Sequence, residues 1–501
     1  MVDSGIIGAI LTALQPINLY YCFIGTFLGT IIGVLPGLGP AAATAMLLPV
    51  TTYLPATGSI IMLAGIYYGA QYGGSTTSIL VNIPGEASSI VTCLDGFQMT
   101  KQGRAGEALS IAAIGSFIAG TLGTLALSIL APFLADFGLR FGPPEYFWLV
   151  VFGLTGVVSL SGASPLKGIM CCAFGMLLTT IGIDPISGLS RGTFGWSRLI
   201  GGLDVVPLVM GLFGIAEMIA SAEEKAVSIY GGKLGNLLPR GKELARGLAA
   251  CLRGTIVGFL PGLMPGMIPA LTSFWAYDIE KRISKTPERF GRGAIEGVAA
   301  PEAANNATSQ AGFIPLMCFG IPTSSTLAIM LAALTLHGLT PGPVLFTRDA
   351  SFAWAVIGSM YVGNTMLLIL NLPLVGLWAR LSRVPYKILS PLVLGICVVG
   401  AYSVRNSLFD VWVCVIFGVI GYLMKKLKWP PIALLLGYIL GDILEKSLQQ
   451  SLQISRGSAI ILVEGPISLV IMILTVGLIV FSIFLRKKRG EEFDLSTKEE
   501  I

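Results

Sequence analysis

Long apolar stretches dominate the chain and alternate with short blocks of Lys and Arg. Residues 4–85 contain no Asp, Glu, Lys or Arg, and further apolar stretches follow up to residue 485. Because a spanning helix needs about 20 predominantly apolar residues, this pattern predicts several membrane crossings. Strands of outer-membrane barrels alternate polar and apolar residues, whereas LVIMILTVGLIVFSIFL (469–485) is almost uniformly apolar. We predict an all-α, polytopic helical protein of the inner membrane.

The apolar stretches and the basic blocks between them predict an organisation. Beyond residue 104, we expect crossings over 108–133, 146–161, 164–182, 203–221, 353–379, 388–402, 409–424, 430–444 and 459–485. By the positive-inside rule the basic blocks lie in the cytoplasm, together with the C-terminus. The predicted parts are an N-terminal segment (1–16), a first transmembrane repeat (17–220), a cytoplasmic linker (221–246), a second transmembrane repeat (247–485) and a cytoplasmic tail (486–501).

A motif rich in proline and glycine occurs twice within apolar sequence. GTIIGVLPGLGP (29–40) returns as GTIVGFLPGLMP (254–265), with nine of twelve positions identical. Around the second copy, prolines recur every four residues from Pro261, and each proline inside a helix costs about 3 kcal/mol or more. We predict two short arms, 247–260 and 266–277, that meet inside the membrane as a re-entrant hairpin. A kinked spanning helix is the alternative.

The charges that flank the two copies differ. Arg246 and Arg253 precede the second copy and Lys281 follows it, whereas the first copy has no charged neighbours. If both flanks of the second copy are cytoplasmic, its hairpin enters from that side, and the first hairpin enters from the other. The two halves would then be inverted-topology repeats, each with a re-entrant hairpin and a broken helix, as in many secondary transporters.

Each hairpin is followed by a stretch that combines small polar residues with an Ile-Pro step. These stretches are YYGAQYGGSTTSILVNIPGEASS (67–89) and PEAANNATSQAGFIPLMCFGIPTSSTLA (301–328). N–H groups freed at half-helix N-termini attract carboxylates. Freed carbonyls and the oxygens of Ser, Thr and Asn suit a hard cation such as Na⁺. The pattern predicts an anion site coupled to Na⁺, and its alternative is that the small polar residues hold helices together.

The candidate site draws on both halves. The predicted substrate-binding residues are Pro36, Gly37, Gly39, Ser75, Thr76, Thr77, Asn82, Gly85, Pro261, Gly262, Asn305, Asn306, Thr308, Ser309, Thr323 and Ser324. Backbone carbonyls and hydroxyls near Gly37, Asn82, Gly262 and Asn306 are expected to hold Na⁺. Acids within a membrane are functional hypotheses by default, and Glu86 and Glu302 lie beside the two breaks.

Other chemistry finds no support in the sequence. No Walker motif, nucleophile elbow or HExxH zinc motif occurs, so we predict no catalytic residue, no enzyme activity and no cofactor besides Na⁺ as the coupling ion. The net charge of +5 lies mainly in loops and indicates orientation in the membrane rather than nucleic-acid binding.

Three segments resemble a known family. GVLPGLGPAAATAMLLPVT, YYGAQYGGSTTSILVNIPGEASS and PEAANNATSQAGFIPLMCFGIPTSS are similar to signature segments of TctA, the large membrane subunit of tripartite tricarboxylate transporters, and the likeness extends from about residue 17 to about 485. The family pattern maps onto Pro36, Gly37 and Gly39 in the first hairpin. In the second it maps onto Pro261 and Gly262, and Met264 stands at the position equivalent to Gly39.

The resemblance implies a function and two partners. The function is the import of tricarboxylates or related carboxylates by cation symport, usually with Na⁺. The partners are a small four-helix membrane subunit (TctB-like) and a periplasmic solute-binding protein (TctC-like). We expect alternating access. The alternatives are an autonomous ion- or proton-coupled permease without a binding protein and, in another class, a membrane enzyme or scaffold.

Overall fold

Helices make up nearly all of the regular structure. The computed structural model describes residues 6–35, 38–160, 164–184, 187–223, 236–239, 241–374, 377–378, 381 and 386–480. Within these ranges the strands are one antiparallel pair, β1 (Gly182–Ile183) and β2 (Ser190–Arg191). Six of the described helices are long and apolar enough to cross a membrane. The prediction of an all-α, polytopic membrane protein is confirmed.

The chain forms two compact units, and each unit draws on both halves of the sequence. The first takes the described residues of Met1–Leu139 and Asp204–Lys426, and the second those of Arg140–Leu203 and Leu427–Ile501. The compact units therefore cut across the repeat boundaries expected from the sequence, because helices from both halves interleave in each unit. The division into repeats at 221–246 stays a prediction about the sequence, and residues 224–235 and 240 of that linker lie outside the described ranges.

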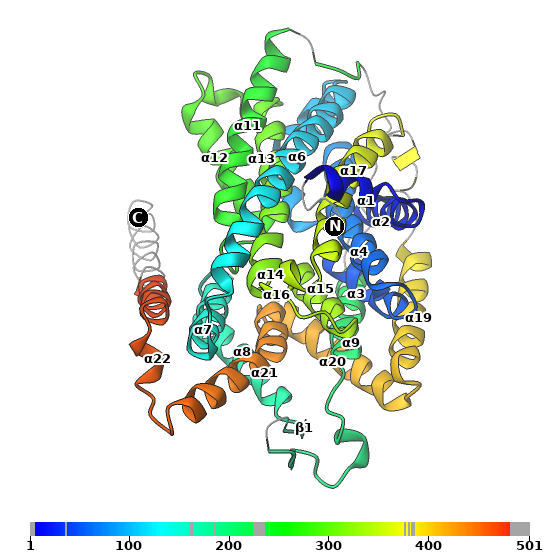
Figure 1. Ribbon diagram of the computed structural model, residues 1–501. Helices are drawn as coiled ribbons and strands as arrows, with labels where there is room; N and C mark the ends of the chain where they lie inside the picture. Colours follow the sequence, from blue (N-terminus) through cyan, green and yellow to red (C-terminus); the bar gives the residue numbers. More distant parts are fainter. Residues whose placement is uncertain are drawn as a thin grey trace, which may run out of the picture. The chain divides into compact units, whose positions relative to one another are not determined.

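The second unit is the smaller of the two and contains neither copy of the hairpin motif. It contains α7 (Pro143–Leu160), α8 (Pro165–Thr179), the β1–β2 pair, η2 (Ser197–Leu199), α21 (Pro431–Ile454) and α22 (Ile461–Glu464) (Figure 1). Arg191 of β2 forms a salt bridge with Glu445 of α21 at 2.6 Å. The Trp148 indole donates to the carbonyl of Leu462 in α22 at 2.7 Å, so α21 and α22 are each bonded to the earlier segment.

The first unit contains two series of helices, and each begins with two hairpin arms followed by a helical segment that ends at an Ile-Pro step. The first set is α2 (Pro16–Val34), α3 (Pro40–Thr51), α4 (Ala56–Val81), η1 (Ala87–Ser89), α5 (Ile90–Lys101) and α6 (Ala105–Gly138). The second set is α11 (Lys242–Gly262), α12 (Pro269–Ile283), α13 (Glu296–Ala311), α14 (Phe313–Phe319), α15 (Ser325–Leu336) and α17 (Ala350–Asn371). The unit also holds α1 (Ile6–Ala13), α9 (Val205–Val209), the π-helix η3 (Met210–Ile215), α10 (Ala216–Ala222), η4 (Pro287–Arg289), α16 (Val344–Thr347), α19 (Tyr386–Arg405) and α20 (Leu408–Lys426).

Glycines let the first hairpin arm lie directly on the helix that follows it. A Cβ on Gly25 of α2 would overlap the backbone of Met62 in α4. Two turns further along, a Cβ on Gly33 would overlap the backbone of Ala70. Each glycine costs about 1 kcal/mol of helix propensity relative to alanine, which the close backbone contact offsets. Since both residue numbers rise together, α2 and α4 run parallel.

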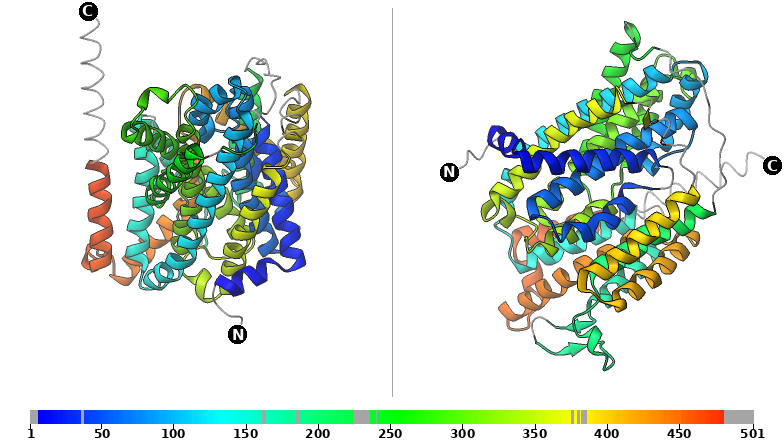
Figure 2. Two further views of the ribbon diagram at one scale, coloured as in Figure 1. Left: turned by 90° about the horizontal axis from the view of Figure 1, so that it is seen from above. Right: turned by 90° about the vertical axis from the view of Figure 1, so that its right-hand side faces the viewer.

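The second repeat uses the same packing. Gly254 of α11 lies against Ala300 of α13, and Gly262 lies against Thr308. These two helices therefore also run parallel. The hairpin arms α11 and α12 lie side by side (Figure 2), and Arg253 of α11 pairs with the buried Glu280 of α12 at 2.6 Å.

The two repeats cross in opposite directions. Gln71 of α4 donates to Ser309 of α13. Ser75, one turn later in α4, donates to Glu302, which lies two turns earlier in α13. Helices α4 and α13 are therefore antiparallel. Because α2 is parallel to α4 and α11 is parallel to α13, the two hairpins also run in opposite directions, as expected of inverted-topology repeats.

Both broken helices end in the same way. Helix α4 ends at Asn82, which has φ of 59°, and α14 ends at Gly320, which has φ of 71°. An Ile-Pro step follows each of these residues directly. Asparagine and glycine are the residues that adopt the left-handed conformation at lowest cost, and proline cannot continue the helix. The two Ile-Pro steps predicted as breaks thus correspond in structure as well as in sequence.

Two predicted boundaries need correction. Helix α11 continues through Pro261 to Gly262 and α12 begins at Pro269, so the second hairpin turns at 263–268. Pro261 lies in the last turn of α11, so the helical segment that follows this proline is a single residue. The predicted crossing at 459–485 is interrupted at Gly465, which is extended, before a helix over Pro466–Val480. The residue before a proline disfavours the helical conformation, and that proline starts the next helix.

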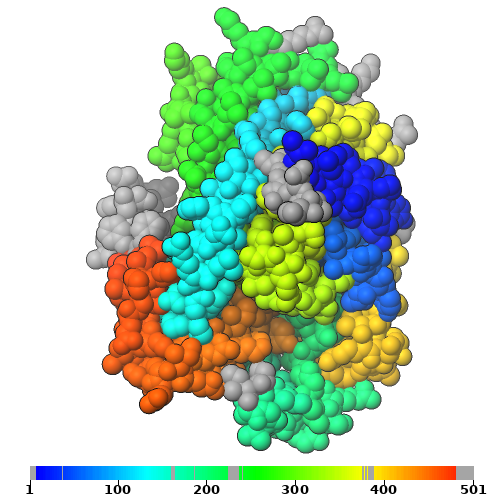
Figure 3. All heavy atoms as spheres, in the orientation of Figure 1, coloured from blue at the N-terminus to red at the C-terminus, as the bar shows by residue number. Residues whose placement is uncertain are grey.

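The core of the first unit centres on α13. All sixteen residues of α13 are buried, and α6 packs against both α13 and α14. Figure 3 shows α6 in cyan, with the yellow-green residues of the segment that holds α14 to α16 beside it. The thiol of Cys318 in α14 donates to the carbonyl of Ala131 in α6 at 3.4 Å. A helix buried on every side that carries Glu, Asn, Thr and Ser must pair these polar groups inside the protein.

Candidate functional site

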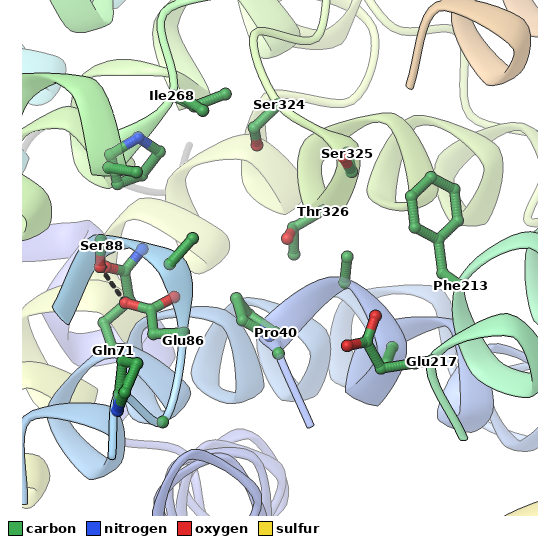
Figure 4. A pocket seen from close by; sticks show the side chains of 18 of the residues that line it. Pro40, Gln71, Glu86, Ser88, Phe213, Glu217, Ile268, Ser324, Ser325 and Thr326 are labelled. Carbon is green, nitrogen blue, oxygen red and sulfur yellow. Dashed lines mark hydrogen bonds between the residues drawn. The ribbon is translucent and has the colours of Figure 1, made fainter. Parts of the chain in front are cut away.

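One cavity in the first unit is lined by both hairpins and both broken helices. Its volume is about 580 Å³. Four segments border it, namely residues 39–42, residues 83–90 with the exception of Ser89, residues 268–270 and residues 324–326 (Figure 4). Tyr67 and Gln71 of α4 also line it. Paired breaks that share one cavity are the arrangement that the repeat pattern predicted.

Each of the four segments is the N-terminal end of a helix. Helix α3 begins at Pro40, η1 at Ala87, α12 at Pro269 and α15 at Ser325. The first N–H groups of a helix have no carbonyl partner within it, and the helix dipole adds partial positive charge at this end. Four such ends around one cavity give it the character of an anion-binding site.

Two of the four helix ends already carry a side-chain cap. The hydroxyl of Ser324 accepts from the N–H of Leu327 at 3.4 Å at the start of α15, and the Glu86 side chain caps η1. The N-cap residues of α3 and α12 are Gly39 and Ile268, and within the described ranges no side chain caps either helix. One end from each hairpin therefore offers backbone donors to a ligand.

Three charged side chains border the cavity. Glu86 is bonded to the hydroxyl of Ser88. Glu217 of α10 pairs with Lys425 of α20, and these side chains are 25% and 37% exposed. Figure 4 shows Glu86 and Glu217 on either side of Pro40. Lys425 is the cation placed to meet a ligand carboxylate, provided that it exchanges Glu217 for the ligand.

The helix that carries Glu217 is irregular. Asp204 caps α9 by accepting from the N–H of Val206 at 2.8 Å, and burial raises the pKa of Asp204. The π-helix η3 follows and brings Phe213 to the cavity. Single π-helical turns within α-helices are frequent at functional sites, and here the extra residue per turn sets where Phe213 and Glu217 face the cavity.

Three of the predicted site residues line the cavity, and the others lie elsewhere or outside the described ranges. Gly39, Gly85 and Ser324 line the cavity. Pro36 and Gly37 lie outside the described residues. Asn82 is the left-handed residue that ends α4, and Pro261 and Gly262 form the last turn of α11. The carbonyl of Thr323 accepts from the N–H of Gly266 at 3.3 Å and so ties the second hairpin turn to the second break.

The remaining predicted residues lie behind the cavity and bond to protein groups. Ser75 and Asn305 donate to Glu302, and Ser309 accepts from Gln71. The other donors and their acceptors are Thr77 to the carbonyl of Gly74 at 3.0 Å, Asn306 to Ser116 at 2.8 Å, and Thr308 to the carbonyl of Gly258 at 2.9 Å. Thr76 borders a second, smaller cavity. These contacts fit the alternative in which small polar residues join helices.

Glu302 is the centre of this polar cluster. It is fully buried and accepts from Ser75, Thr92 and Asn305. Among the residues that the structure describes, no Lys or Arg pairs with it. An ionised carboxylate in the interior is costly unless hydrogen bonds and a compensating charge stabilise it. Of the residues expected to hold Na⁺, Gly37 lies outside the described ranges, Asn82 ends α4 and Gly262 ends α11. Asn306 is bonded within this cluster.

Several cavity residues were not predicted. Pro40, Pro269 and Ser325 directly follow the breaks, so the preference for proline at the first helical position and for serine as a cap could have identified them. Phe213, Glu217 and Lys425 lie in segments with no motif. Their approach depends on tertiary packing of η3, α10 and α20, for which the local sequence has no signal.

Fold and site together define a class: a polytopic α-helical membrane protein in which two oppositely directed repeats enclose a cavity suited to an anion. The chain belongs to the tripartite tricarboxylate transporter TctA family, because a model of that family matches residues 19–436. Family membership identifies it as the large membrane subunit of a tripartite transport system, as the resemblance of its motifs implied.

Two relatives come from Agrobacterium vitis. The "uncharacterized 52.8 kDa protein in TAR-I ttuC' 3'region" is 46% identical over 486 residues, covering 96% of this chain and 97% of the relative. The "uncharacterized protein in TAR-II ttuC' 3'region" is 42% identical over 225 residues, covering 44% of this chain and 93% of the relative. No solved structure matches the chain.

Proposed function

We propose that this chain is the permease of a binding-protein-dependent secondary transporter in the bacterial inner membrane. It imports tricarboxylates or related carboxylates by cation symport, with Na⁺ as the coupling ion. A TctB-like four-helix subunit and a TctC-like periplasmic solute-binding protein act with it. The observation that carries the proposal is the convergence of four helix N-termini from both repeats on one cavity.

The cavity has the size and the donors for a small polycarboxylate. Its volume of about 580 Å³ lies within the range of roughly 300–1,000 Å³ usual for small-molecule sites. The uncapped ends of α3 and α12 come from opposite repeats. Each end can receive one carboxylate, and Lys425 can receive a third. A ligand with two or three carboxylates therefore bridges the two repeats, whereas a monocarboxylate engages one of them.

The opposed direction of the repeats supports a mechanism of alternating access. Helices α4 and α13 are antiparallel, and each carries its own hairpin. When two inverted repeats exchange conformations, a site between them opens first to one face of the membrane and then to the other. A substrate held by both repeats links their movement.

Uptake into proteoliposomes tests the proposal. The permease is reconstituted with its small subunit, and uptake of citrate, tartrate and aromatic dicarboxylates is measured with an inward Na⁺ gradient. We expect accumulation of one of these classes at low concentration, dependent on both Na⁺ and the binding protein. Equal uptake without the binding protein would support the autonomous permease instead. Equal uptake without a cation gradient would contradict symport.

A further inference from the structure

A second cavity in the first unit is the size of a single small ion. It lies among α4, α6 and α17 and has a volume of about 10 Å³, close to the minimum of roughly 10–15 Å³ that holds one water molecule. Its polar lining residues are Tyr72, Ser75, Thr76, Ser116 and Asn371. All of them are neutral, and all of them offer oxygen.

One lining residue carries an oxygen without a partner. Asn371 is 5% exposed. Its Nδ2 donates to the carbonyl of Leu367 at 2.9 Å, while its Oδ1 has no hydrogen-bond partner in the described part of the chain. Buried acceptors in folded proteins are nearly always paired. An occupant of the cavity that accepts an oxygen lone pair would give Oδ1 of Asn371 a partner.

Two of the other oxygens, those of Tyr72 and Ser75, offer lone pairs to the cavity but no proton, while the Ser116 hydroxyl accepts from Nδ2 of Asn306 at 2.8 Å. The hydroxyl of Tyr72 donates its proton to Asn364 Oδ1 at 2.8 Å, and that of Ser75 donates to Glu302. Their lone pairs remain available, whereas their protons do not. A water molecule needs acceptors for its own two protons and also a donor for its oxygen. A cation needs oxygen lone pairs alone.

Glu302 supplies the balancing charge. Its carboxylate is fully buried and lies one hydroxyl away from the cavity, through Ser75. Without a Lys or Arg partner, its charge is compensated by a single positive charge nearby. Divalent ions usually require several carboxylates, and the described residues contain no group of three or more His, Cys, Asp or Glu side chains placed to hold a metal.

We propose that this cavity binds one small monovalent cation, Na⁺ in preference to the larger K⁺. Tyr72, Ser75, Thr76, Ser116 and Asn371 are its ligands, and Glu302 neutralises it. The role of the ion in symport rests on the proposed function. On α4, Ser75 is one turn from Gln71, which borders the large cavity, so the same helical turn faces both sites. Occupation by the cation orders this turn and thereby the substrate site.

The ion is tested on the purified full-length protein in detergent. Thermal unfolding is followed in NaCl, LiCl, KCl and choline chloride at constant ionic strength. We expect saturating NaCl to raise the melting temperature by about 4 °C or more over choline, with KCl near choline. Asn371→Leu and Thr76→Val should each lose at least half of this shift. Asn371→Asp keeps the oxygen and should retain it.

Ser110→Ala is the matched control. Ser110 lies in α6, the helix of the proposed ligand Ser116, and is 1% exposed. Its hydroxyl has no partner among the described residues, but Ser110 does not line the cavity. Its shift with Na⁺ should equal that of the wild type. The proposal is overturned by a wild type without a Na⁺-specific shift, by equal shifts in Asn371→Leu and Ser110→Ala, or by a full shift in Glu302→Gln.

A second titration separates this proposal from the transport proposal. The same preparations are titrated with citrate, tartrate and an aromatic dicarboxylate, both in saturating NaCl and in choline chloride. A carboxylate-induced rise in melting temperature without any Na⁺ shift overturns the cation site alone. A Na⁺ shift lost in Asn371→Leu, without a response to any carboxylate, supports the cation site and contradicts the proposed function.

Discussion

The two hairpins begin from nearly the same twelve residues and yet turn at different points. In the first, α3 starts at Pro40, the last residue of the motif. In the second, the equivalent Pro265 lies within the turn, and α12 starts four residues later at Pro269. The helix end facing the cavity therefore has Gly39 as its N-cap in one repeat and the bulky Ile268 in the other. Repeats that agree in packing thus differ at the ligand, which gives the cavity two unlike sides.

The largest effect is expected where the repeats agree. Gly33 and Gly258 are equivalent positions, and a Cβ on either would overlap the backbone of the following helix. We expect Gly33→Val and Gly258→Val each to abolish uptake and to lower thermal stability, because overpacking costs about 1–3 kcal/mol or more. Uptake and melting temperature check both variants. Gly395→Ala in α19, where a Cβ meets no atom within 4 Å, is the control, and wild-type behaviour of either valine variant would contradict the shared packing.

The next effect concerns the side on which the repeats differ. A Cβ on Gly39 meets no atom within 4 Å, so Gly39→Asp fits and caps α3 with its own carboxylate. We expect thermal stability to hold or rise slightly, since Asp is better than Gly as an N-cap by only about a few tenths of a kcal/mol. Uptake should fall at least tenfold, because that carboxylate occupies the donors intended for the substrate.

Gly39→Asn separates charge from shape. It has the same size and capping ability but no charge, so its loss of uptake should be clearly smaller than that of Gly39→Asp. Equal uptake in both variants and in the wild type would show that the end of α3 does not bind substrate.

A smaller effect is expected from the ion pair beside the cavity. Lys425→Gln removes the cation and should raise the KM for the carboxylate about fivefold, the scale of a partly exposed charge contact. Glu217→Gln frees Lys425 and should lower KM or leave it unchanged. Lys426→Gln is the matched control, because Lys426 pairs with Glu223 at 3.4 Å and does not line the cavity. A rise in KM for Glu217→Gln as large as that for Lys425→Gln would contradict the exchange of partners.

The smallest effect compares the unit that holds the cavity with the one that does not. Arg191→Gln removes the salt bridge to Glu445 in the second unit. Since exposed pairs contribute about 0.2–1 kcal/mol, we expect a slight fall in melting temperature. Steady-state uptake should show an unchanged KM. A change in KM beyond twofold would mean that substrate affinity depends on the second unit.

The sequence allowed the repeats and their breaks to be predicted because proline and glycine act locally. The Ile-Pro steps, the hairpins and most crossings agree with the structure to within a few residues. The exact turn of the second hairpin did not follow, because three closely spaced prolines, including Pro261 and Pro269, offered several places to end and restart a helix. Packing of Gly262 against Thr308 favours the later break, and that contact depends on α13.

The place of the cavity beside the breaks could be predicted, but its lining residues only in part. Helix ends after the breaks indicated an anion site, and they surround the large cavity. Polar residues on α4 and α13 could not be assigned to ligand or to packing from spacing alone, because both helices are buried on nearly all sides. Ser75 and Ser309 bond to the partner repeat, whereas Asn305 donates to Glu302 of its own helix. Lys425 comes from another part of the chain, and only the folded unit brings it to the cavity.

The opposed hairpins also have a consequence for biosynthesis. The insertion machinery encounters almost the same glycine–proline motif twice and must insert the two copies in opposite orientations. Because the two motifs are nearly identical, they cannot determine the orientation, so the neighbouring arginines and lysines must do so. The first copy lies among dozens of uncharged residues, and the second lies between positively charged residues. The flanking charges therefore determine the orientation of each hairpin, and the cavity forms only when both hairpins have inserted correctly.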